Sequence, residues 1–197
     1  MIIHVSGPSG SGKTTLGKKL KKKFGNRIRV KDIDDLRAEF VKKHYGGYDK
    51  IWSKKKFTWD KKAYQKHIDA YVKKIKTPLV LVGLNHMPWW GKNHYYGVHS
   101  THNFYIKLPI DTIFEQKCIR YLNILSVYER VEMLKALKKN EKQAVKVYQQ
   151  GFASECSYEL NKKQCAMWNK AYKNQKYKFM TREKILAEVS KLIRNKI

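Results

Sequence analysis

One stretch near the start of the chain has the spacing of a phosphate-binding loop. Residues Gly7–Thr14 read Gly-Pro-Ser-Gly-Ser-Gly-Lys-Thr and fit the pattern G-x-x-x-x-G-K-[ST] without a mismatch. Glycines let such a loop wind tightly, so that successive backbone N–H groups point at phosphate oxygens. Lys13 is expected to reach the β- and γ-phosphates, and the Thr14 hydroxyl to coordinate Mg²⁺. The residues predicted to bind the nucleotide are Gly7, Ser9, Gly10, Ser11, Gly12, Lys13, Thr14 and Thr15.

A second group of chemically capable residues follows the alternating stretch 27–31. Asp32, Asp34 and Asp35 fall there together, although the chain has only 16 acidic residues. Ligands of open α/β sheets bind at the carboxyl ends of the strands. We predict that Asp32 supports Mg²⁺ through water and that Asp34, on the same side of the strand, is the base for an acceptor hydroxyl. The alternative is that Asp34 or Asp35 only caps the next helix.

The elements that must position these residues alternate along the chain. Strand-like segments lie at 2–5, 27–31, 79–84, 103–108 and, as an edge strand, 177–180, and helical patterns separate them. This alternation predicts an α/β fold of three layers, with a parallel sheet of about five strands between helices. The run 79–84 ends without the acid that phosphate-binding-loop proteins often carry there. We expect one domain over residues 1–197, with a lid-like helical region at about 121–176.

Composition limits the setting in which the chain works. Its 197 residues carry a formal net charge of +27, which attracts nucleotides or nucleic acids. Most of the excess is lysine, which is equally typical of a solvated surface, so nucleic acid is a possible partner only. Neither a signal-like start nor a run of about 18 apolar residues is present, and the three cysteines lack metal spacing. We expect a cytoplasmic protein that does not enter a membrane.

With these residues in view, the chain resembles the small P-loop kinases, which include nucleoside monophosphate, shikimate and polynucleotide kinases. Asp32-x-Asp34 is similar to the paired acids of shikimate kinase, and Asp34-Asp35-Leu36-Arg37 to the Asp-Asp-x-Arg of polynucleotide kinases. The resemblance implies that Asp34 is the catalytic base and that Arg37 binds the acceptor. It also implies a lid with arginines, a place that Arg120 and Arg130 fit, with Lys117 as a substitute for one of them.

The function expected from the sequence is the transfer of the γ-phosphoryl group of ATP, with Mg²⁺, to a small acceptor such as a nucleotide or nucleoside. Lys13, Asp34 and Arg120 are the expected catalytic residues. The alternatives are a polynucleotide 5′-hydroxyl kinase and a nucleotide-binding module without catalysis. Aromatic residues of the stretch 85–96 and the pair Trp52 and Trp59 are candidates for stacking on a base. The acceptor and the oligomeric state are not predicted.

Overall fold

The computed structural model describes residues 1–52, 60–84, 98–124, 129, 131–132, 135 and 157–197. These residues form two compact units. The first unit contains Met1–Gly7, Gly12–Lys107 and Ala171–Ile197, and the second contains Pro8–Ser11 and Leu108–Lys170. Among the described residues, no helix is both long and apolar enough to cross a bilayer.

The first unit is built on a parallel sheet of five strands. The strands are β1 (Ile2–Ser6), β2 (Arg29–Asp32), β3 (Leu79–Val82), β4 (His102–Ile106) and β5 (Lys178–Met180). Their order across the sheet is β2-β3-β1-β4-β5, and every neighbouring pair is parallel. The predicted α/β fold with a five-stranded parallel sheet is therefore confirmed, as is the position of the last strand at an edge.

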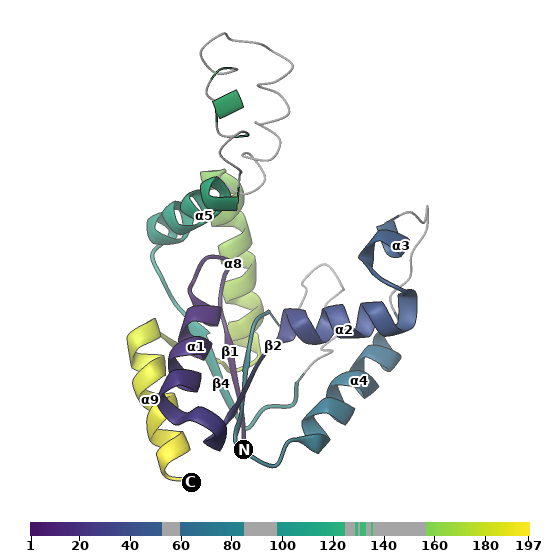
Figure 1. Ribbon diagram of the computed structural model, residues 1–197. Helices are drawn as coiled ribbons and strands as arrows, with labels where there is room; N and C mark the ends of the chain where they lie inside the picture. Colours follow the sequence, from purple (N-terminus) through teal and green to yellow (C-terminus); the bar gives the residue numbers. More distant parts are fainter. Residues whose placement is uncertain (53–59, 85–97, 125–128, 130, 133–134, 136–156) are drawn as a thin grey trace. The chain divides into compact units, whose positions relative to one another are not determined.

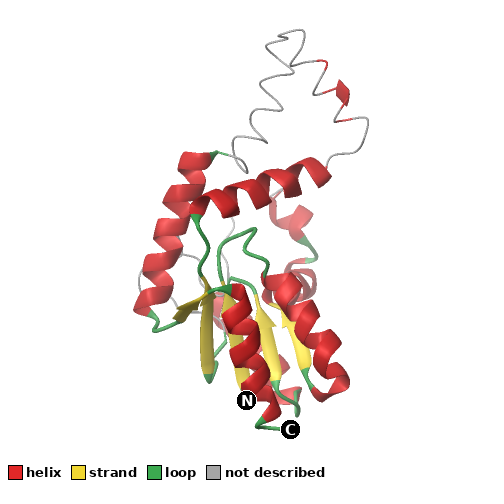
Figure 2. Ribbon diagram, turned by 90° about the vertical axis from the view of Figure 1, so that its left-hand side faces the viewer, coloured by secondary structure: helices red, strands yellow, loops and turns green. Residues whose placement is uncertain are grey.

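Helices cover both faces of this sheet (Figures 1 and 2). One face carries α1 (Lys13–Phe24) and α9 (Arg182–Arg194), which contact each other and the strands. Gly17 of α1 lies close to the sheet, because a Cβ atom there would be 3.0 Å from Val30 Cγ1 and 3.3 Å from Val82 Cγ1. The other face carries α2 (Ile33–Tyr45) and α4 (Lys61–Lys74), whose apolar residues form one core cluster with Leu79 and Leu81. The short helix α3 (Tyr48–Trp52) follows α2.

The second unit consists of the loop tip Pro8–Ser11 and two helices, α5 (Ile110–Ile124) and α8 (Tyr158–Asn174), of which α8 runs on into the first unit. The Tyr158 hydroxyl donates to Asp111 Oδ1 at 2.9 Å, and its ring contacts Phe114. Lys117 is buried between the helices and donates to Asn161 Oδ1 at 2.7 Å. Half of the region predicted as a lid, 121–176, lies outside the described residues.

The junction between β2 and α2 differs from the predicted one. The second strand begins at Arg29 because Gly25–Arg27 form a 3₁₀ turn, and it continues to Asp32. The helix begins directly afterwards, at Ile33. Asp32 is the N-cap, since its carboxylate accepts a hydrogen bond from Asp34 N–H at 3.0 Å. The alternative that Asp34 or Asp35 caps this helix is therefore wrong, and Asp32 caps it instead.

Candidate functional site

The loop Gly7–Thr14 connects β1 to α1, as the sequence predicts. Gly12 is the N-cap residue of α1 and has φ +80 and ψ +23, a left-handed conformation that glycine adopts without steric cost. Ser11 N–H donates to Pro8 C=O at 3.1 Å and closes the turn before it. Lys13 Nζ donates to Gly7 C=O at 2.8 Å, so the lysine lies along the loop. A strand, a tight glycine turn and a helix N-terminus in this order suit an anion.

Three neighbouring strands place the candidate site at one edge of the sheet. The loop Gly7–Thr14 follows β1, Gly83 follows β3, and Asp32 is the last residue of β2. The strand order puts β2, β3 and β1 side by side, so their carboxyl ends meet. This is the edge at which open α/β sheets bind ligands.

Asp32 joins the β2–α2 junction to the helix that follows the loop. Its Oδ2 accepts a hydrogen bond from the Thr14 hydroxyl at 3.2 Å, while Oδ1 caps α2. Partial burial raises the pKa of this carboxyl, and the negative charges of Asp34 and Asp35 raise it further. The two hydrogen bonds lower this pKa, but the net shift is upward. A raised pKa means that the charged form of Asp32 is destabilised, and a cation beside the carboxylate would stabilise that form. The hydroxyl and carboxylate oxygens of Thr14 and Asp32 therefore fit Mg²⁺, which prefers oxygen ligands and retains water.

The residue after β3 leaves room for this carboxylate. A Cβ atom at Gly83 would lie 3.1 Å from Asp32 Oδ1 and 3.1 Å from Ile33 Cβ. Gly83 also has φ +131, which disfavours other residues. A side chain at this position would crowd Asp32, so the chain cannot carry a second acid there without moving the first.

Asp34 and Arg37 form an ion pair at the same edge. Arg37 Nη1 lies 2.5 Å from Asp34 Oδ1, and Nη2 donates to Leu84 C=O at 3.0 Å. The Asp34 side chain is 69% exposed and that of Arg37 only 13%, so the arginine holds a solvent-facing carboxylate in place. Asp32 and Asp34 do not share one side of a strand, because β2 ends at Asp32 and Asp34 is in the first turn of α2.

An arginine that the sequence analysis did not select lies against the loop. A Cβ atom at Gly12 would be 2.7 Å from Arg182 Nη1 and 3.3 Å from its Cδ. Arg182 is the first residue of α9, which Thr181 caps, and its Nε lies 3.3 Å from Glu183 Oε1. Its position in a terminal amphipathic helix gave no signal of this contact, because Gly12 and Arg182 are far apart in the sequence.

Of the remaining predicted residues, Trp52 ends α3 in the first unit, and the others lie in the second unit or outside the described residues. Arg120 is exposed on α5. The Lys117 stem contacts the loop tip, where a Cβ atom at Gly10 would be 3.1 Å from Lys117 Cγ. Arg130, Trp59 and the stretch 85–97 are outside the described residues. Among those described, no three His, Cys, Asp or Glu side chains form a metal-binding group. The catalytic and lid roles given to these residues stay predictions.

Comparison with known proteins adds three distant likenesses in fold. Shikimate kinase from Aquifex aeolicus aligns with a TM-score of 0.48 and 16% identity over 100% of this chain and 98% of its own. A tRNA delta(2)-isopentenylpyrophosphate transferase from Staphylococcus epidermidis aligns with a TM-score of 0.48 and 12% identity over 98% and 99%. An uncharacterised protein from Eubacterium ventriosum aligns with a TM-score of 0.45 and 16% identity over 99% and 98%. No family model and no curated protein matches the sequence. The fold assignment therefore rests on the strand order and the loop.

Proposed function

We propose that this chain is a Mg²⁺-dependent phosphotransferase that moves the γ-phosphoryl group of ATP to a small acceptor such as a nucleotide or nucleoside. The observation that carries the proposal is the meeting of the loop Gly7–Thr14, the Asp32–Thr14 pair and the exposed Asp34 at one edge of the sheet. Phosphoryl transfer requires little covalent chemistry from the protein. Positioning and charge neutralisation, which these residues can provide, supply most of the rate enhancement.

Each residue has a defined part in this proposal. Lys13 exchanges the Gly7 carbonyl for phosphate oxygens, and the backbone N–H groups of the loop hold the phosphate chain. Thr14 and Asp32 would hold Mg²⁺, which neutralises phosphate charge when bound. Arg182, next to Gly12, is a second cation for the phosphates within the first unit. Asp34, oriented by Arg37, accepts the proton of the acceptor hydroxyl.

A polynucleotide 5′-hydroxyl kinase is the second candidate. The Asp34–Arg37 ion pair and the net charge of +27 favour it, because Asp-Asp-x-Arg and a strongly basic surface both suit a nucleic-acid acceptor. In that case the lysine-rich surface would contact the strand beyond its terminal nucleotide. Affinity for an oligonucleotide would then fall steeply as the salt concentration rises, whereas activity on a mononucleotide would change little.

The test incubates the protein with γ-labelled ATP, Mg²⁺ and a panel of nucleosides, nucleotides, shikimate-like acids and 5′-hydroxyl oligonucleotides. Label transferred to one class of acceptor identifies the substrate, and transfer should be lost in Lys13→Ala. Lys18→Ala is the matched control, since Lys18 is exposed on the same helix away from the loop. ATP binding without transfer to any acceptor would point to a nucleotide-binding module instead. No ATP binding would overturn the proposal.

A further inference from the structure

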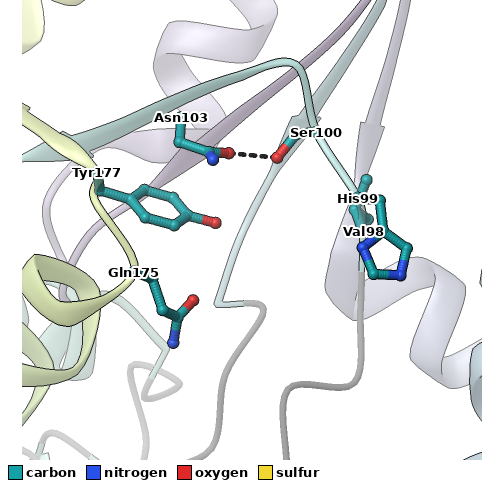
Figure 3. Close-up of a pocket in the computed structure, with 6 residues that line it drawn as sticks. All are labelled: Val98, His99, Ser100, Asn103, Gln175 and Tyr177. Carbon is teal, nitrogen blue, oxygen red and sulfur yellow. Dashed lines mark hydrogen bonds between the residues drawn. The ribbon is translucent and has the colours of Figure 1, made fainter.

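A cavity of about 280 Å³ lies at the amino ends of β4 and β5, whereas Asp32 and Asp34 lie at the carboxyl edge of the sheet. It is lined by Val98, His99, Ser100, Asn103, Gln175 and Tyr177, which Figure 3 shows around one space. Three of these residues precede β4, Asn103 is the second residue of β4, and two precede β5. Ligand pockets commonly measure about 300–1,000 Å³, so this one would take a small molecule or one group of a larger one.

Among the residues that the structure describes, the lining has four polar side chains besides Tyr177 and no lysine, arginine, aspartate or glutamate, in a chain with 43 lysines and arginines. The Ser100 hydroxyl donates to Asn103 Oδ1, so the amide oxygen is occupied and the amide nitrogen of Asn103 is the group that can donate. Gln175 Oε1 is buried and has no hydrogen-bond partner within the described part of the chain. A buried acceptor in this state is rare and destabilising, and a ligand donor would satisfy it.

Tyr177 forms a fixed wall of the cavity. His4 Nδ1 lies 2.5 Å from the Tyr177 hydroxyl oxygen, and His4 Nε2 lies 3.0 Å from Gly83 C=O. Because a carbonyl oxygen can only accept, Nε2 carries the proton, Nδ1 accepts and Tyr177 donates. Burial keeps His4 neutral at pH 7 by lowering its pKa to about 4. The hydroxyl proton of Tyr177 is therefore directed toward β1, and its buried ring stays in one orientation.

We propose that this cavity is a second binding site, for an uncharged planar group with an N–H donor beside a carbonyl or ring-nitrogen acceptor. A nucleobase edge or a primary amide has this pattern. Its N–H group would donate to Gln175 Oε1, and its acceptor would receive a hydrogen bond from Asn103 Nδ2. Asparagine and glutamine side chains read adenine through such a donor–acceptor pair. The described lining offers an anion no lysine or arginine as a partner, which favours an uncharged group.

The site is tested by titrating adenine, cytosine, uracil and acetamide into the full chain with saturating ADP and Mg²⁺, followed by ligand-observed NMR and calorimetry. ADP keeps the phosphate-binding loop filled, so that binding there is not mistaken for binding in the cavity. A group of this size with two or three hydrogen bonds should bind with a Kd of about 1 mM. Acetamide binding as tightly as the bases would assign the amide class, and tighter binding of one base would assign the nucleobase class.

Two substitutions locate the binding. Gln175→Leu and Asn103→Leu should each weaken it by about tenfold or more, because each leaves a polar ligand atom without its partner. Asn174→Leu is the matched control, since Asn174 is exposed and adjacent to Gln175 in sequence, and it should bind as the wild type does. Melting temperatures of the variants show that each has folded. Absence of binding by all four probes, wild-type affinity in both cavity variants, or displacement by ADP would overturn the proposal.

Discussion

Replacing Gly12 by alanine tests whether the backbone of the loop must come close to a bound phosphate. Gly12 has a left-handed conformation, in which an L-residue costs about 1–2 kcal/mol. The new Cβ atom would lie 2.7 Å from Arg182 Nη1, and the far end of that side chain can move away. We therefore expect a loss of stability of about 1 kcal/mol, and a melting temperature lower by about 2–4 °C for a chain of this size.

The larger effect is expected on nucleotide affinity. Displacing Arg182 would remove the proposed charge-assisted hydrogen bond to phosphate, and such a bond contributes about 1.5–3 kcal/mol. This corresponds to a Kd for ATP and Mg²⁺ that is about 10–100-fold weaker, measured by calorimetry. Arg182→Ala should reproduce most of this loss without the backbone strain. The double variant Gly12→Ala/Arg182→Ala should bind ATP only slightly more weakly than the single variant with the larger loss of affinity, because the two residues act through one contact.

Gly46→Ala is the matched control for the strain. Gly46 follows α2, has φ +76, and a Cβ atom there would lie 2.9 Å from the flexible Lys50 side chain. Its melting temperature should fall as much as that of Gly12→Ala, while its affinity for ATP stays at the wild-type value. Wild-type affinity in Gly12→Ala, or an equal loss of affinity in both glycine variants, would refute the assignment of Gly12 to a phosphate site.

Three further predictions concern titratable residues. Asp32→Asn keeps the helix cap and removes a partly buried charge, so stability at pH 7 should hold or rise while calorimetry shows that Mg²⁺ no longer strengthens ATP binding. Asp34→Asn should lower kcat by about 10²–10⁴-fold with ATP affinity nearly unchanged. If Asp34→Asn keeps full turnover and Asp35→Asn loses it, the base is Asp35 and not Asp34. The pKa of His4 falls to about 4 in the fold, from an ordinary value near 6.5, so the unfolded chain binds the proton first as the pH falls. Urea unfolding should therefore show the wild type losing on the order of 3 kcal/mol between about pH 6.5 and 4, and His4→Gln should lack this loss.

The sequence was sufficient for the features that depend on local pattern. The loop, the alternation of strands and helices, and the edge position of the last strand follow from glycine spacing and from runs of apolar residues. The sequence pattern placed the second strand at 27–31 and did not show that a helix begins at Ile33, because the cap of that helix depends on a hydrogen bond from Asp34 N–H to the Asp32 carboxylate that periodicity does not reveal. Long-range contacts, such as that of Arg182 with Gly12, leave no trace in periodicity.

The carboxylate at position 32 is the feature that distinguishes a functional edge from a structural one. A helix cap needs only an acceptor oxygen, which asparagine provides equally well without a charge. Asp32 instead holds a partly buried charge near Asp34 and Asp35, and this raises its pKa. Gly83 gives that charge space, and Thr14 directs a hydroxyl at it from the first turn of α1. Capping alone explains none of these three features, whereas the proposed role of Asp32 and Thr14 in holding Mg²⁺ would account for the charge and for the hydroxyl beside it.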